Sequence, residues 1–207
     1  MLNRLFAAAA GGLFAMTAVA ASAQPAPAPA PAGPAPLAIP NPRYTTMVLE
    51  LDVNRPAQAV WARVGGYCAI SEWMGFTCAI TGGTDNQLGA VRTLNGTIIE
   101  MLVAKTDLSY TYTQPVRVGV PYNVYHGTLE VKPLTPATSR LVYSFFYDVS
   151  MLADDAARAT EATNRRNRFM QGMQNMKILA EGGTVPATAL PSRPAAAAAP
   201  AAAAPAR

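Results

Sequence analysis

A long amphipathic segment, residues 153–181, gives the strongest structural signal in the chain. Phe169, Met173 and Met176 recur there at i, i+4 and i+7, which is the spacing of one helix face. Two glycines follow the segment, and glycine is favoured just after a helix end. The pattern predicts one helix about 43 Å long, whose apolar face needs a partner layer.

Alternating apolar and polar residues predict a sheet as that layer. Residues 45–53 alternate as a half-buried strand does. Two short helices are expected next, at 57–64 and 69–73, with Pro56 suited to the first turn. Further strands are expected at 77–81, 90–94, 97–104, 108–113, 122–132 and 140–149. Because no long helix separates these strands, the sequence favours an α+β fold with an antiparallel sheet.

Five short motifs stand in order along these elements. They are VNRPAQAVWARVGGY (53–67), EW (72–73), GAVR (89–92), TIIEML (97–102) and GMQNMKILAE (172–181). With the element order, they resemble the helix-grip SRPBCC superfamily, which includes START domains, Bet v 1-like allergens, polyketide cyclase/dehydrase-type proteins and, more distantly, plant abscisic-acid receptors. The resemblance implies a curved seven-stranded sheet around the C-terminal helix, with an apolar cavity between them for a lipophilic ligand.

The N-terminal end has the pattern of a signal peptide. Residues 1–23 carry a basic Arg4, an apolar run over 5–19 and a small-residue ending, which predicts cleavage after Ala23. The alternative is an uncleaved membrane anchor, although the run is shorter than the ~20 residues that a bilayer needs. Either interpretation places the domain outside the cytoplasm, so we expect a periplasmic or secreted protein.

The flanks of the domain are rich in alanine and proline. Residues 24–41 and 184–207 have this composition, which cannot bury a core, so we expect extended, disordered segments there. The predicted domain is residues 42–183. The functional residues are therefore expected within residues 42–183.

Charge and cysteine content narrow the choice of partners. The chain has 16 Lys and Arg against 12 Asp and Glu, without a basic run, which argues against nucleic acid. With two cysteines and one histidine, we expect no metal site, and we expect no cofactor. Cys68 and Cys78 are either disulfide-bonded, as export would favour, or two buried thiols. A transient contact with a membrane or the cell envelope stays open.

Glu100 is the most informative candidate site residue. It lies mid-strand on the apolar face that Ile98 and Leu102 share, where an unpartnered carboxylate is costly to bury. By resemblance, it matches a glutamate that contacts ligand in the abscisic-acid receptors. Two alternatives stay open: a buried ion pair with Arg92 across the hairpin, or an exposed side chain if the register shifts by one residue.

Other side chains are expected to face the same interior. Buried tyrosine hydroxyls need partners, and methionines suit loosely specified ligands; dense core packing is the alternative. The predicted lining residues are Tyr110, Tyr125, Tyr143, Phe145, Tyr147, Met173 and Met176. Gly172 either leaves room for ligand or allows close helix packing. Phe76 stands where the receptors have a carboxylate-anchoring lysine, which suggests a neutral or differently oriented ligand.

Three functions follow from these patterns. The first is an exported binding protein that holds a small hydrophobic molecule, such as a lipid, polyketide or aromatic compound. The second is a cyclase- or dehydratase-like enzyme, with Glu100 as general base and Tyr110 or Tyr125 polarising a carbonyl. The third is a structural or interaction domain with a filled interior. A hormone-receptor function is not expected, because the short Leu94-Asn95-Gly96 turn replaces the receptors' gate loop.

Overall fold

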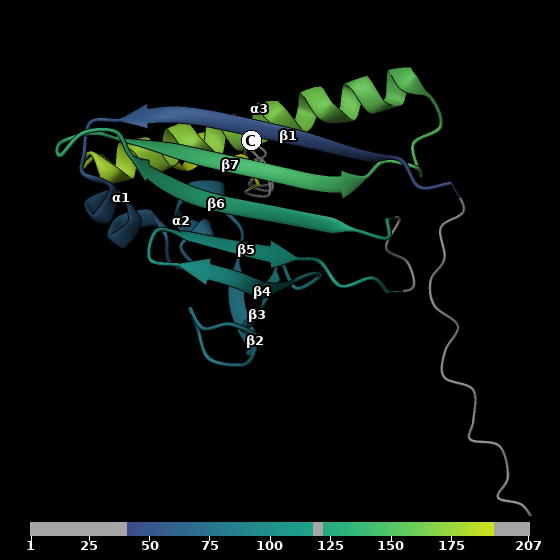
Figure 1. Cartoon of the computed structure of the whole chain (residues 1–207), viewed down its shortest axis with the longest axis horizontal. Coiled ribbons are helices and arrows are strands. Elements are labelled where there is room, and N and C mark those ends of the chain that lie inside the picture. The colour runs from purple at the N-terminus through teal and green to yellow at the C-terminus, as the bar shows by residue number, and fades with distance from the viewer. Residues whose placement is uncertain (1–40, 118–121, 193–207) are drawn as a thin grey trace, which may run out of the picture. The chain divides into compact units, whose positions relative to one another are not determined.

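The sheet of this protein runs antiparallel in the order β1-β7-β6-β5-β4-β3-β2 (Figure 1). The structure, a computed structural model, describes residues 41–117 and 122–192. The strands are β1 Tyr44–Val53, β2 Cys78–Gly82, β3 Val91–Leu94, β4 Ile98–Thr106, β5 Ser109–Thr113, β6 Tyr125–Pro133 and β7 Ser139–Asp148. The helices are α1 Ala57–Val64, α2 Ile70–Met74, α3 Asp155–Ala180 and the short 3₁₀ helix Ala187–Ala189. The predicted α+β helix-grip fold is confirmed.

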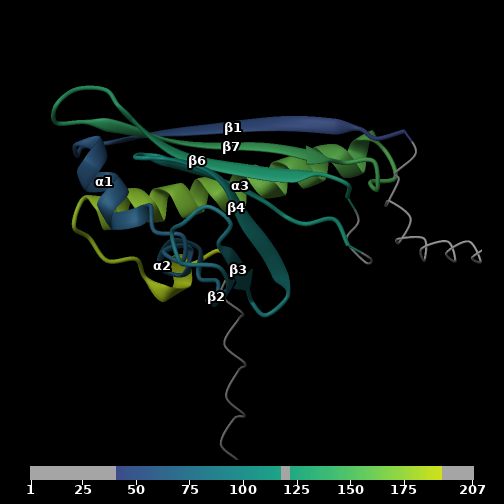
Figure 2. The same ribbon diagram turned by 60° about the horizontal axis from the view of Figure 1, so that its bottom comes forward.

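Helix α3 lies beneath β1, β7 and β6 (Figure 2). Its first turn is capped by Asp154, whose carboxylate accepts a hydrogen bond from the Ala157 N–H at 2.7 Å. The buried residues of this 26-residue helix all lie in its second half: Phe169, Gly172, Met173, Asn175, Met176 and Leu179. The first half therefore contributes no fully buried side chain to the core.

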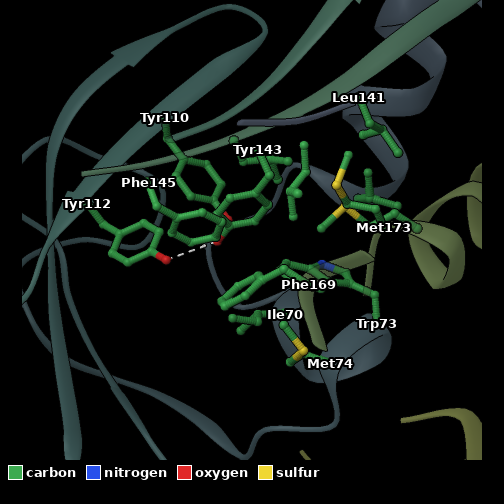
Figure 3. Close-up of a cluster of buried hydrophobic side chains, with 14 of the residues drawn as sticks. Ile70, Trp73, Met74, Tyr110, Tyr112, Leu141, Tyr143, Phe145, Phe169 and Met173 are labelled. Carbon is green, nitrogen blue, oxygen red and sulfur yellow. Dashed lines mark hydrogen bonds between the residues drawn. The ribbon is translucent and has the colours of Figure 1, made fainter. Parts of the chain in front are cut away.

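The centre of the layer between sheet and helix is filled by rings (Figure 3). Tyr143 and Phe145 of β7 stack with centroids 4.6 Å apart. Phe169 of α3 packs onto both, with centroids 5.0 Å and 4.4 Å away. Trp73 of α2 meets Tyr143 edge-on at 6.3 Å. Such contacts add to the area that the rings bury, so this cluster holds α2, α3 and the sheet together.

The chain beyond Gly183 corrects the predicted domain end. Residues 184–192 were expected to be an extended tail, but the Asn175 amide donates hydrogen bonds to the Trp73 and Ala189 carbonyls at 2.9 and 2.8 Å. The Ser192 N–H donates to the Met74 carbonyl at 2.9 Å. Because a buried amide needs acceptors, Asn175 binds this segment to α2. The predicted signal peptide, nearly all of the linker, and residues 193–207 lie outside the described residues.

A disulfide joins Cys68, which precedes α2, to Cys78 at the start of β2. It links the short helical segment to the edge of the sheet. Among the two alternatives for these cysteines, the structure therefore contains the bonded pair. In the described part of the chain, no helix is both long and apolar enough to cross a membrane.

Gly127 of β6 provides a test of how tightly the sheet is packed. A Cβ atom at this buried position would overlap the ring of Tyr112, whose hydroxyl lies 3.1 Å from that of Tyr143. We expect Gly127→Ala to lower the free energy of unfolding by about 1–3 kcal/mol, measured by urea denaturation. Gly82→Ala is the matched control, because its Cβ would meet Val91 at an ordinary 3.5 Å. Equal effects of the two substitutions would contradict this packing.

Candidate ligand-binding site

The side chains that the sequence assigned to the interior come from the sheet and α3, except Phe76, which lies between α2 and β2. Seven are buried: Tyr110, Tyr125, Tyr143, Phe145, Tyr147, Met173 and Met176. Phe76 is partly buried against the same core. Most of these side chains pack against one another, so the interior around Tyr143 and Phe169 is core rather than a ligand cavity.

Glu100 lies in this interior as one half of a buried ion pair. Arg92 of β3 stands directly opposite Glu100 of β4 in the sheet register. The Arg92 Nε and Nη2 atoms donate to Glu100 Oε2 at 2.8 and 2.6 Å, and Nη1 donates to the Tyr67 carbonyl. Arg92 is 0% and Glu100 3% exposed. This is the ion-pair alternative that the sequence left open.

The second oxygen of Glu100 is engaged as well. Gln114 Nε2 donates to Glu100 Oε1 at 3.0 Å, and the Tyr122 hydroxyl donates to Gln114 Oε1. A general base must lie within hydrogen-bonding reach of the proton that it abstracts. Since both carboxylate oxygens already accept internal hydrogen bonds, this geometry gives no support to Glu100 as a base. Glu100 instead connects Arg92, through Gln114, to Tyr122.

Burial and charge act in opposite directions on Arg92. Burial alone would lower the pKa of its guanidinium, but the adjacent Glu100 carboxylate outweighs that effect and raises the pKa above its ordinary value. The Tyr67 ring lies 4.1 Å from the guanidinium carbon, within cation–π range. Arg92 is therefore a charged structural group inside the domain.

Gly172 allows close packing between two helices. A Cβ atom there would meet the Met74 and Trp73 side chains of α2, each at 3.3 Å. Side chains of α2 therefore occupy the space that Gly172 was expected to leave for a ligand. The sequence could not show this, because α2 is distant in the chain and its approach depends on tertiary packing.

An open groove runs along the first half of α3. A hollow of about 210 Å³ is lined by Tyr122, Tyr125, Tyr147, Asp148, Val149, Met151, Leu152, Glu161 and Arg165. The adjacent face of α3 presents Ala157, Thr160, Glu161, Asn164, Arg165, Arg168 and Phe169. Because this face and the hollow share Glu161 and Arg165, we treat them as one site, the α3 groove.

A network of four side chains forms the floor of the α3 groove. Arg165 Nε donates to Glu161 Oε1 at 2.6 Å, and Arg165 Nη1 donates to the Tyr125 hydroxyl at 2.6 Å. The Tyr147 hydroxyl donates to Glu161 Oε2 at 2.8 Å. The Arg165 guanidinium carbon lies 4.2 Å from the Tyr147 ring centroid. Tyr125 and Tyr147, both predicted from sequence, therefore reach the groove through their hydroxyls.

These contacts fix the charges of the network. Burial alone would lower the pKa of Arg165, but Tyr125 and Glu161 outweigh it and raise the pKa. Burial, and then the hydrogen bond to Glu161, raise the pKa of Tyr147 to about 12. At neutral pH the network thus holds a charged Arg165 and neutral tyrosine hydroxyls.

Glu161 and Arg165 were not predicted from the sequence as site residues. They form an acid-then-base pair at i,i+4, which is typical of a solvated helix surface. Their positions nevertheless continue the stripe of Phe169 and Met173 toward the helix N-terminus, four residues at a time. A charged pair on the core-facing stripe was the signal that could have identified them.

The seven-stranded antiparallel sheet and the long C-terminal helix define a helix-grip fold. Residues 44–181, more than half of the chain, match the family described as polyketide cyclase/dehydrase and lipid transport. The chain belongs to this family. A comparison with curated proteins finds no match.

Solved structures share the fold at low sequence identity. A Thermobifida fusca protein solved by NMR is 22% identical, with 68% of this chain and 97% of that chain covered and a TM-score of 0.57. Truncated norcoclaurine synthase from Thalictrum flavum is 13% identical, with 72% and 100% covered and a TM-score of 0.55. The di-domain ARO/CYC protein BexL is 16% identical, with 66% and 46% covered and a TM-score of 0.53. At these identities the likeness shows the fold alone.

Replacing Glu100 tests whether its role is structural. We expect Glu100→Gln to lower the free energy of unfolding by about 3 kcal/mol or more, because it leaves the Arg92 charge buried without a counter-ion. Urea denaturation monitored by circular dichroism would measure the change. Glu130→Gln on β6 is the control, since Glu130 pairs at 3.6 Å with a half-exposed Lys132 and such pairs contribute about 0–1 kcal/mol. A Glu100→Gln variant as stable as this control would contradict the structural role.

Proposed function

We propose that this protein is an exported binding protein that holds a small hydrophobic molecule in the α3 groove. The observation that carries the proposal is the groove itself, an open site beside a densely packed core. Its family is described by lipid transport as well as by polyketide cyclisation, which supports a lipophilic ligand.

The lining of the groove suits such a ligand. Tyr122, Met151 and Leu152 supply accessible apolar surface, while the hydroxyls of Tyr125 and Tyr147 are already satisfied by Arg165 and Glu161. A ligand can therefore cover these rings without leaving their hydroxyls unpaired, a loss that would cost about 1–3 kcal/mol per group. Most small-molecule sites combine apolar walls with a few fixed polar groups in this way.

The filled interior favours this location over the central cavity that the resemblance implied. Trp73, Met74 and Phe169 occupy the space between α2, α3 and the sheet. A filled interior was also the expectation for a purely structural domain. The open α3 groove favours the binding function, because a structural domain has no need of an open site.

Export is supported by two independent features. The signal-peptide pattern of residues 1–23 predicts cleavage after Ala23. The Cys68–Cys78 disulfide is of a kind that persists in oxidising compartments. We therefore propose that the mature protein is periplasmic or secreted.

Binding can be tested with the neutral lipophilic dye N-phenyl-1-naphthylamine. We expect its fluorescence to rise on binding, and Asn164→Trp, which places a large side chain in the groove, to weaken binding by about tenfold or more. Asn167→Trp is the matched control, because Asn167 is exposed on α3 but does not line the groove. Absence of dye binding, or equal affinity in the two variants, would refute the proposed site.

Export can be tested by expressing all 207 residues in a bacterial host and measuring the intact mass of the product. We expect a periplasmic or secreted protein that begins at Gln24. A full-length protein confined to the cytoplasm would show that the N-terminal segment does not act as a signal.

A further inference from the structure

The two edges of the sheet differ in how they are protected (Figure 1). One edge is β2, which has only five residues, and its pairing with β3 is interrupted between Ile80 and Gly82. The other edge is β1, whose ten residues pair with β7 without interruption. Proteins protect exposed edges with short strands, bulges, proline or lysine. Because β1 is long, regular and free of proline and lysine, it has none of these protections.

The backbone of β1 presents hydrogen-bonding groups along this edge. The Val149 N–H of the β7 side donates to the Arg43 carbonyl at 2.7 Å, and hydrogen-bonded positions alternate along an antiparallel pair. The N–H and C=O groups of Thr46, Val48 and Glu50 therefore point away from β7. In the described part of the chain, no other residue forms a hydrogen bond with them.

Apolar side chains gather on the solvent-facing side of the same edge. Val48 is 54% exposed and Phe146 of β7 is 40% exposed. The Tyr44 ring packs on Phe146 with centroids 5.3 Å apart. Helix α3 packs on the opposite side of the sheet (Figure 2), so it does not cover this surface. A strand that pairs with β1 would cover part of it.

The charges of β1 are compatible with pairing between two copies of the chain. We consider a two-fold axis at Val48, which uses the whole strand. The opposed pairs are then Val48 with Val48, Thr46 with Glu50, and Tyr44 with Asp52. No like charges stand opposite each other, which would be unfavourable. Within each copy, Arg140 binds Glu50 at 3.1 Å and Asp52 at 2.6 Å, so these carboxylates are already neutralised.

The two copies of Glu50 are also well separated in this register. They stand four residues apart along the paired strands, which is about 13 Å. This distance exceeds the screening length of about 8 Å at physiological ionic strength. A second copy of β1 therefore satisfies the exposed backbone groups without a charge penalty.

We propose that this protein forms a symmetric homodimer in which the β1 strands of two copies pair antiparallel and join the two sheets into one. Thr46, Val48 and Glu50 supply the backbone hydrogen bonds, and Val48 lies on the two-fold axis. Two-fold interfaces use the same surface on both subunits, as this register does. The dimer does not depend on the proposed ligand, because the sheet residues of the α3 groove come from β6, β7 and the segments beside them.

Sedimentation equilibrium of the full mature protein over a range of concentrations tests the dimer. We expect reversible dimerisation in the wild type. Val48→Lys should weaken it by about tenfold or more, because the substitution places like charges opposite each other on the axis. Val103→Lys is the matched control, since Val103 is 44% exposed but lies in β4, away from this edge. It should change the dissociation constant by less than about twofold.

Crosslinking tests the register by a second route. Val48→Cys should be joined between copies by a short bismaleimide, because opposed Cα atoms of a hydrogen-bonded antiparallel pair lie about 5.5 Å apart. Val103→Cys should not be joined, and the native cysteines are bonded to each other. Circular dichroism verifies that each variant is folded.

The outcomes separate the parts of the proposal. A wild type that stays monomeric at every concentration would overturn the dimer, whichever other partner the edge has. Equal weakening by Val48→Lys and Val103→Lys would show that the dimer forms elsewhere. A dimer in which Val48→Cys is not crosslinked would overturn the pairing of the β1 strands.

Discussion

The contact of Phe169 with the stacked rings of Tyr143 and Phe145 decides where this domain can hold a ligand. The three rings lie with centroids 4.4–5.0 Å apart and join the middle of α3 to β7. On one side of them, α2 and the segment 184–192 pack against the second half of α3. On the other side, the first half of α3 leaves the groove open. The ring contact therefore separates the closed core around α2 from the open α3 groove.

The closed part contains an ion pair that a core of this kind tolerates only with full hydrogen bonding. Arg92 and Glu100 satisfy each other, and the Tyr67 carbonyl and Gln114 complete their coordination. Removing two charges from water is costly, so the pair adds less stability than its short distances suggest. The pair also fixes the position of Gln114, which connects Glu100 to Tyr122 at the edge of the groove.

The sequence predicted the framework well because strands and helices have simple periods. Alternation located the strands around Tyr110, Tyr125 and Tyr143, and the helical spacing of Phe169 and Met173 located α3. These patterns could not show whether the rings enclose a void, because that depends on how Phe169 and Trp73 pack in three dimensions.

The side-chain contacts of the candidate site were harder to predict, because they also depend on tertiary packing. The partner of Glu100 depends on the β3–β4 register, so Arg92 could only be an alternative. Glu161 and Arg165 have the spacing of an ordinary surface pair. Their orientation toward Tyr125 and Tyr147 is a tertiary property. Packing of residues 184–192 depends on one buried amide, Asn175, which leaves no periodic signal in an alanine- and proline-rich segment.

The central claim is that a ligand occupies the α3 groove and not the interior. A ¹H–¹⁵N NMR titration of the mature protein with dodecanoate tests it most directly. The account predicts that the largest chemical-shift changes fall between Ala157 and Phe169 and at Tyr147, with little change at Arg92, Glu100 and Gly172. The largest changes around Arg92, Glu100 and Gly172 would instead place the ligand inside the core and contradict the account.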